Sequence, residues 1–430
     1  MSRPITEQTK AILLLTAPLI VGKQRSDGPK ILTPAEYNKL AARLVELSKQ
    51  PLDLLGRERE DLAHELGSIL EPERLLRLLE RGLLMSQAID QWQTRGIWIV
   101  SRADPDYPVR LKAKLKKQAP PVLYGCGDRA LLERGGLGIV GSRKVDDAIC
   151  EFVKDAAQLA AQSGYSVVSG GAKGVDLIAM RSALEVDGTV VGALAENLSR
   201  AVVSPLFREP IKRRDVTLVS AVDPNAGFNV GNAMSRNKLI YAFADAGLVA
   251  NSDYEKGGTW AGATEQINRL RCCPVYVRTT DRTPKGNKAL IERGAFPWPE
   301  PKDVAAMSAL MEKPLQKSVG IEATELDFNA APASTGTETK PVVKEEVAAP
   351  VPAEKISEQS PSEEIFGVVE HAIITLLKER SMNETELTEA LGVVKTQTRA
   401  WLDALVEKGV VEKTKKPVRY RLNTSQITLF

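Results

Sequence analysis

Histidine and cysteine are scarce in this sequence. Its 430 residues include two histidines, His64 and His371. The four cysteines are Cys126, Cys150, Cys272 and Cys273. The cysteines lack the spacing of a zinc site, and the two histidines are too far apart in the sequence to act as local partners. We therefore expect neither a bound metal nor a disulfide framework, and a reducing, cytoplasmic compartment is the default expectation.

Long hydrophobic runs are also missing. The longest apolar run near the start covers residues 11–21, contains Pro18 and follows Glu7. This run is too short to cross a membrane and is poorly flanked for a signal peptide. We interpret it as buried core. With 43% apolar residues the chain is expected to be globular, and its length predicts several domains.

Neither sign of charge dominates, because 58 Lys and Arg residues face 55 Asp and Glu residues. Residues 303–364 are the exception, with 12 acidic and 5 basic residues and a composition rich in Ala, Pro, Thr and Glu from Leu326 onward. Such a composition predicts an acidic flexible linker. The remaining segments, 1–115, 116–302 and 365–430, are each mildly basic, which permits nucleic-acid binding without establishing it.

The first of these segments, residues 1–115, is predicted to be a small helical domain of the SAM or helix-hairpin-helix type. Short helical patterns between residues 35 and 95 are separated by glycine and proline breaks such as Pro51 and Gly67. A strand-like run at residues 96–100 then leads into a turn-rich connector.

Residues 116–302 change to alternating strand and helix patterns. The short apolar runs that we predict as strands are residues 137–140, 165–168, 189–194, 218–220, 246–250 and 275–277. Strands that alternate with helices predict an α/β fold with a Rossmann-like, doubly wound parallel sheet. Ligands of such sheets bind at the carboxyl ends of the strands, so the residues after each run are the candidates for a site.

Glycine-rich loops with a basic residue follow three of these strands, and a fourth basic group begins a helix. The predicted anion-binding residues are Gly141, Ser142, Arg143, Lys144, Gly170, Gly171, Lys173, Arg236, Asn237, Lys238, Lys256, Gly257, Gly258 and Thr259. Backbone N–H groups at helix starts, together with Lys and Arg, are suited to phosphate. The fingerprints of mononucleotide P-loops and dinucleotide folds are absent, which favours a nucleic-acid backbone or an unusual nucleotide.

Catalytic machinery is not evident. No histidine occurs in residues 116–302, which excludes a histidine general base there. Asp176 is predicted one turn into a helix, where an acidic side chain commonly balances the helix dipole. Glu265 is retained as the one candidate acid. We predict no catalytic residue, no cofactor and no metal.

Four of the motifs together resemble the DprA/Smf family of DNA-processing proteins. They are residues 123–125, 138–143, 169–176 and 236–238, and the resemblance extends from about Gly96 to Pro299. It implies a non-catalytic, homodimeric protein with a Rossmann-like domain that binds single-stranded DNA. It also implies a RecA-type recombinase as the partner that receives the strand during transformation, with Ser142, Arg143, Lys173, Arg236 and Asn237 at the phosphates.

Two departures from the family pattern leave other functions open. Ala233 stands where the family has an aromatic residue that can stack on a base, and Phe228 is the nearest substitute. Gly257, Gly258 and Thr259, followed by Glu265, are similar to part of a motif of nucleotide-binding proteins that hydrolyse nucleoside monophosphates. The alternatives are therefore such a hydrolase, and a DNA or nucleotide sensor that acts through a partner in defence against phages.

Residues 365–430 resemble a winged helix, with three predicted helices and a hairpin with a basic tip. If this module binds duplex DNA, its third helix presents side chains to the major groove and the wing contacts phosphate. The predicted contact residues are Lys395, Thr396, Gln397, Arg399, Lys415 and Lys416. A module that contacts protein or inhibits its own chain is the alternative.

Overall fold

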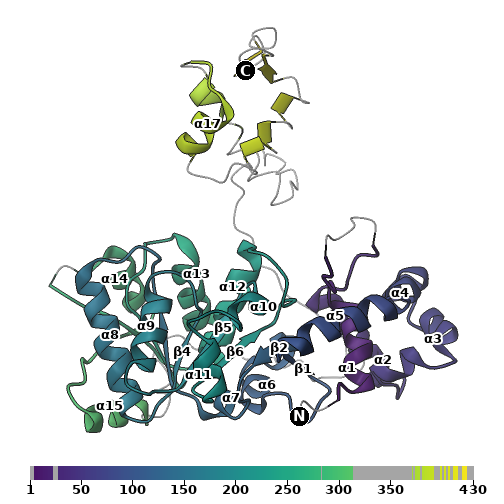
Figure 1. The fold of residues 1–430 in the computed structure, drawn as a ribbon, viewed down its shortest axis with the longest axis horizontal. Coiled ribbons are helices and arrows are strands. Elements are labelled where there is room, and N and C mark those ends of the chain that lie inside the picture. Colours follow the sequence, from purple (N-terminus) through teal and green to yellow (C-terminus); the bar gives the residue numbers. More distant parts are fainter. Residues whose placement is uncertain are drawn as a thin grey trace, which may run out of the picture. The chain divides into compact units, whose positions relative to one another are not determined.

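The computed structural model describes residues 4–22, 28–281 and 283–312, together with parts of residues 370–423. The chain divides into two units, residues 1–324 and 325–430, which we describe separately (Figure 1). Within the described ranges, no helix has both the length and the apolar character needed to cross a membrane.

The first unit begins with a group of helices that starts at Thr6. These helices are α1 (Glu7–Thr16), α2 (Pro34–Glu46), the 3-10 helix η1 (Pro51–Leu55), α3 (Arg59–Glu65), α4 (Pro72–Leu79) and α5 (Gly82–Thr94). Prolines at the first position begin α2, η1 and α4, where the missing N–H group costs no hydrogen bond. In the run 11–21, which we predict as buried core, residues 11–15, Ala17 and Leu19 are buried, and α1 packs against strands β1 and β2 described below.

A nine-stranded sheet forms the centre of this unit. The strands are β1 (Trp98–Ser101), β2 (Val122–Cys126), β3 (Leu137–Val140), β4 (Val167–Ser169), β5 (Val190–Leu194), β6 (Val216–Ser220), β7 (Ala246–Val249), β8 (Val275–Val277) and β9 (Phe296–Pro297). Their order is β1-β2-β6-β5-β4-β3-β7-β8-β9. Strand β2 pairs antiparallel with both β1 and β6. All other neighbouring strands in this order, from β6 through β3 to β9, pair in parallel. The predicted α/β fold with a largely parallel sheet is confirmed.

Helices cover both faces of this sheet. One hydrophobic cluster joins Leu137 and Ile139 of β3 to helices α8 (Asp147–Gln162) and α9 (Val175–Leu184). The other joins Val140 to α12 (Val230–Phe243), α13 (Gly257–Glu265) and α14 (Lys285–Glu292). Successive side chains of a strand point to opposite faces, so burial of both faces produces the continuous apolar runs seen in the sequence.

Shorter helices complete the first unit. They are α6 (Val109–Leu115), the 3-10 helix η2 (Lys116–Gln118), α7 (Leu131–Arg134), α10 (Leu198–Ala201), α11 (Arg208–Lys212), the π-helix η3 (Gln266–Leu270) and α15 (Val304–Met311).

Two predicted domain boundaries differ from the structure. Strand β1 lies in the segment 1–115 that we assigned to the helical domain, yet it pairs with β2 in the main sheet. Helix α15 falls in the predicted linker, but Met307, Leu310 and Met311 are buried in the core and the helix packs on α8. The folded part therefore extends through Met311. The predicted linker residues 313–364 lie outside the described residues.

The second unit has its own small core. It contains α17 (Glu384–Leu391) and the antiparallel strands β10 (Val411–Lys413) and β11 (Tyr420–Leu422). Leu387, Leu402, Val411 and Tyr420 are among its buried residues. The winged helix remains a prediction. Of its proposed contact residues, Lys395, Thr396, Gln397, Lys415 and Lys416 lie outside the described residues, while Arg399 forms an ion pair with Glu384 at 3.0 Å.

Candidate nucleic-acid interface

The parallel sheet has a topological switch point between β3 and β7. The chain passes from β3 to β4, β5 and β6 on one side, and then returns to β7, β8 and β9 on the other side. Loops that leave β3 and β7 therefore separate and open a crevice at the carboxyl ends of these strands, which is where such sheets bind ligands. A cavity of about 440 Å³ occupies this position.

Most of the predicted anion-binding residues line this cavity. Those that do are Gly141, Ser142, Arg143, Lys144, Arg236, Asn237, Lys256, Gly257, Gly258 and Thr259. The lining includes four basic side chains and two acidic ones, Asp176 and Asp253. Gly170, Gly171, Lys173 and Lys238 are not part of it, although Lys173 is exposed and directly follows the lining residue Ala172.

Polar side chains tie the loops of the cavity together. The Ser142 N–H group donates to Asn251 Oδ1 at 2.8 Å, and Thr259 Oγ1 donates to the Gly141 carbonyl at 2.8 Å. Asn237 Nδ2 donates to the Gly258 carbonyl at 2.9 Å. Thr259 and Asn237 thus hold the cavity in shape. We did not single out Asn251 from the sequence, although a polar residue directly after a buried strand is a recognisable signal.

Arg236 forms part of the cavity wall and is almost fully buried. Its side chain is 10% exposed, and Nη1 donates to Asp176 Oδ2 at 3.1 Å and to the Ala193 carbonyl at 3.4 Å. Gly170 makes room for it, because a methyl group there would come within 1.0 Å of Arg236 Nη1. The structure therefore places Arg236 in an ion pair within the cavity wall, and its predicted contact with phosphate stays a prediction.

Asp176, the partner of Arg236, stands in the first turn of α9 as predicted. Its side chain is 6% exposed. Burial raises the pKa of the Asp176 carboxyl, and the Arg236 guanidinium together with backbone N–H groups at Ala172 and Gly170 opposes this shift. The ion pair joins the start of helix α9 to helix α12.

An exposed apolar surface borders the cavity at the start of α12. Phe228 is 52% exposed, and the Arg143 guanidinium lies 5.3 Å from the centre of its ring. Val230 and Met234 are exposed beside it, and all three apolar residues line the cavity. Of these three residues, only Phe228 was predicted from the sequence.

Lys238 and Glu265 form a separate cluster outside the cavity lining. Lys238 Nζ lies 3.3 Å from a Glu265 carboxylate oxygen, and Arg269 pairs with the same carboxylate. Lys238 and Arg269 also donate to Gln118 Oε1. Glu265 is thus held in an ion-pair network and does not line the cavity.

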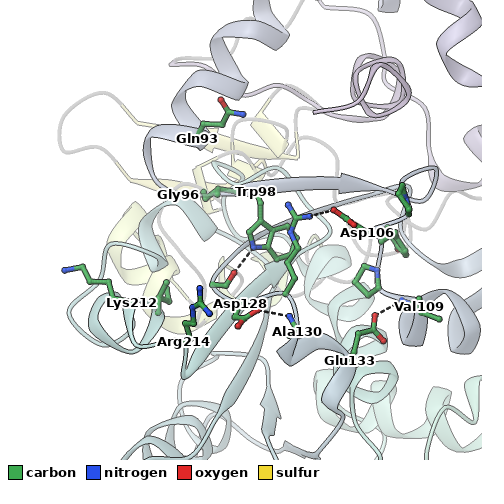
Figure 2. Close-up of a pocket in the computed structure, with 17 residues that line it drawn as sticks. Gln93, Gly96, Trp98, Asp106, Val109, Asp128, Ala130, Glu133, Lys212 and Arg214 are labelled. Atoms are coloured by element: carbon green, nitrogen blue, oxygen red, sulfur yellow. Dashed lines mark hydrogen bonds and ion pairs between the residues drawn. The ribbon is translucent and has the colours of Figure 1, made fainter. Parts of the chain in front are cut away.

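A second cavity, of about 910 Å³, lies near the ends of β1 and β2 (Figure 2). The Trp98 ring packs against Gly125 of β2, and the Arg129 guanidinium lies 4.7 Å from the centre of this ring. Figure 2 shows contacts of three lining residues. Trp98 Nε1 donates to the Gly127 carbonyl, and Asp106 pairs with Arg129. The Glu133 carboxylate accepts from the backbone N–H groups at the start of α6. Three basic and three acidic residues line this cavity, so it is a weaker candidate for an anionic ligand.

Comparison with known proteins identifies the protein family that has this sheet. Residues 98–309 match the protein family described as DNA recombination-mediator protein A. Over these residues the chain belongs to the DprA/Smf family. The matched region begins in β1 and ends within α15, so the family domain has the wider boundaries seen in the structure.

Individual DprA/Smf proteins align with part of the chain. Protein Smf of Synechocystis is 29% identical over 177 residues, which cover 40% of this chain and 44% of that protein. DNA processing protein DprA of Bacillus subtilis is 24% identical over 193 residues, which cover 44% and 63%. The chain thus spans less than two thirds of these relatives. The structure of DprA from Streptococcus pneumoniae superimposes with a TM-score of 0.53 at 19% identity, covering 71% of this chain and 98% of that one, which shows a shared fold.

Proposed function

We propose that this DprA/Smf protein binds single-stranded DNA in the cavity between β3 and β7 and acts in DNA processing and recombination. The observation that carries the proposal is the juxtaposition of exposed basic side chains with an exposed aromatic ring at the switch point of the sheet. Proteins that bind single strands combine a positive groove for the backbone with aromatic rings on which bases stack.

The phosphates would be bound by Arg143, Lys144 and Lys256, which are exposed at the cavity. Helix α13 starts there with Gly257 and Gly258 and has no acidic residue in its first turn. Its N–H groups and the positive end of its dipole would add to the attraction of a phosphate. A base would stack on Phe228. This ring would replace the aromatic residue that the family has at the position of Ala233.

We further propose a binding role without catalysis. This is supported by the position of Glu265, which is ion-paired with Lys238 and Arg269 and is not among the residues that line the cavity. A hydrolase would need this carboxylate within hydrogen-bond reach of the bound nucleotide.

The remaining proposals follow from family membership. The protein is expected to form a homodimer in the cytoplasm, to transfer the strand to a RecA-type recombinase, and to contact duplex DNA or a protein through residues 365–430. Competence and defence against foreign DNA both require the same DNA-binding cavity. Neighbouring recombination or competence genes would favour transformation, whereas a neighbouring effector gene would favour a sensor in defence.

Fluorescence anisotropy with a labelled oligo(dT) at two salt concentrations tests the main proposal. Arg143→Glu should weaken binding by about 1 kcal/mol or more and reduce its salt dependence, because a phosphate contact is lost. Arg213→Glu is the matched control, since Arg213 precedes β6 and thus lies at the opposite edge of the parallel sheet. Equal affinities for Arg143→Glu and the wild type would contradict the proposal.

A further inference from the structure

A second aromatic ring with a cation on its face lies next to the proposed DNA-binding cavity. Tyr254 belongs to the loop that follows β7, and Lys285 Nζ lies 4.3 Å from the centre of its ring. Ser252, Asp253 and Lys256 of the same loop line the cavity. Since consecutive Cα atoms are about 3.8 Å apart, the Cα atom of Tyr254 is within about 8 Å of that of Lys256.

The Tyr254 ring is held in a fixed orientation. Trp260 of α13 meets it edge to face, with the ring centres 5.2 Å apart. Trp260 is 8% exposed, and Arg293, directly after α14, lies 4.8 Å from the centre of the Trp260 ring. Tyr254 thus rests on the helix whose first residues line the cavity, so the ring and the cavity share one rigid support.

Lys285, by contrast, has little to keep it in place. It is exposed at the first position of α14, where a positive charge meets the positive end of the helix dipole, and the first turn of α14 has no acidic residue. Among the residues that the structure describes, Lys285 has no carboxylate partner, and its Nζ atom lies over the face of Tyr254. An anion beside Tyr254 would therefore attract Lys285 and free the ring face.

The arrangement repeats the one at Phe228, an exposed ring of the cavity lining that is covered by the Arg143 guanidinium. In both places a base can replace the cation on the ring, while the cation moves to a phosphate. We propose that Tyr254 is a second base-stacking site, so that a single strand passes from Phe228 through the cavity to Tyr254 and Lys285. This inference rests on the proposed function.

The charges around Tyr254 define what this site contributes. Asp253 and Glu255 flank Tyr254 in the sequence and are exposed, and their charges offset those of Lys256 and Lys285. The site therefore contributes base stacking and a surface that fits the strand, rather than net positive charge. Loss of the ring should accordingly weaken binding to the same extent at low and at high salt, unlike loss of Arg143.

The experiment compares full-length wild type, Tyr254→Leu and Tyr254→Phe by anisotropy with a series of oligo(dT) lengths. We expect Tyr254→Leu to bind long oligonucleotides about 5- to 100-fold more weakly at every salt concentration, and to bind the shortest ones as the wild type does. Tyr254→Phe should match the wild type because it keeps the ring. Thermal melting of both variants shows whether the Trp260 contact affects the fold.

Photo-crosslinking gives an independent measurement. Oligonucleotides with 5-iododeoxyuridine at successive positions should crosslink to Phe228 and, from a different position of the strand, to Tyr254, as identified by mass spectrometry. Crosslinks at Phe228 alone, together with unchanged affinity of Tyr254→Leu for all lengths, would overturn the second stacking site and leave the proposed function intact. A wild type without affinity for single strands would overturn both.

Discussion

Arg236 and Asp176 form an ion pair of 3.1 Å in the wall of the cavity, with side chains that are 10% and 6% exposed. They are 60 residues apart in the sequence and join α12 to the start of α9. Because each charge compensates the other in a buried position, we propose that Arg236 positions the basic loops rather than binding phosphate as an exposed ligand.

Asp176→Asn separates these two roles by the direction of its effect on DNA affinity. If Arg236 binds phosphate directly, removal of a negative charge beside it should strengthen binding. If the pair positions the loop, binding should weaken and the folded state should lose about 3–5 kcal/mol, because a buried guanidinium is left without its counter-charge. We expect the second outcome, measured by anisotropy and by chemical denaturation.

Asp253→Asn is the control for this experiment. Asp253 also lines the cavity, but it is exposed, so its removal should leave stability unchanged and affinity equal or higher. Gly170→Ala provides a second way to displace Arg236, because the added methyl group would occupy the place of its Nη1 atom. Tighter binding by both Asp176→Asn and Gly170→Ala would refute the positioning role.

Glu36 in the helical region predicts a pH dependence of stability. The hydrogen bond from Arg74 and the Thr33 backbone N–H group lower the pKa of Glu36 from 4.5 to about 2. The folded state therefore binds this proton less readily than the unfolded chain. The resulting stabilisation is present above pH 4.5 and is lost as the pH falls towards 2. Glu36→Gln should cost about 1 kcal/mol at pH 7, and the difference from the wild type should disappear near pH 2 in urea titrations.

The parallel strands could be predicted from the sequence because both of their faces are buried. Residues 137–140 and 275–277 match β3 and β8 at both ends. Strands β2 and β9 were missed, since β2 was recognised only as a motif and β9 has two residues. Helix α15 was missed because the acidic composition of the following segment concealed three buried apolar residues.

The candidate site was predictable in outline for a different reason. Carboxyl ends of parallel strands meet at one edge of the sheet, so the loop at residues 141–144 and the segment at residues 256–259 could be placed together. The ion pair of Arg236 and the network around Lys238 were not predictable, because their partners are distant in sequence and nothing in the local pattern distinguishes a buried arginine from an exposed one. The contact between Tyr254 and Lys285 depends on the same long-range packing.

Self-association provides a further prediction. We expect light scattering of the full chain at micromolar concentration to give about twice the monomer mass of 46.8 kDa. Two cavities on one particle would then make binding to long single strands cooperative. A monomeric mass both with and without oligonucleotide would contradict the proposed homodimer, and hyperbolic binding isotherms with a Hill coefficient of one on long strands would contradict the cooperativity.

The last prediction separates the DNA-binding protein from a nucleotide hydrolase. Hydrolysis of a nucleoside monophosphate would need a carboxylate close to the bound sugar, together with basic groups at the phosphate. Glu265 instead forms ion pairs with Lys238 and Arg269 and does not line the cavity between β3 and β7. We therefore expect the purified protein to release no free base from AMP or the other nucleoside monophosphates in a chromatographic assay.

Glu265→Gln should retain nearly full affinity for single-stranded DNA and lose at most about 1 kcal/mol of stability, as for a surface ion pair. Turnover of any monophosphate by the wild type that exceeds turnover by Glu265→Gln would instead identify Glu265 as catalytic and favour the hydrolase.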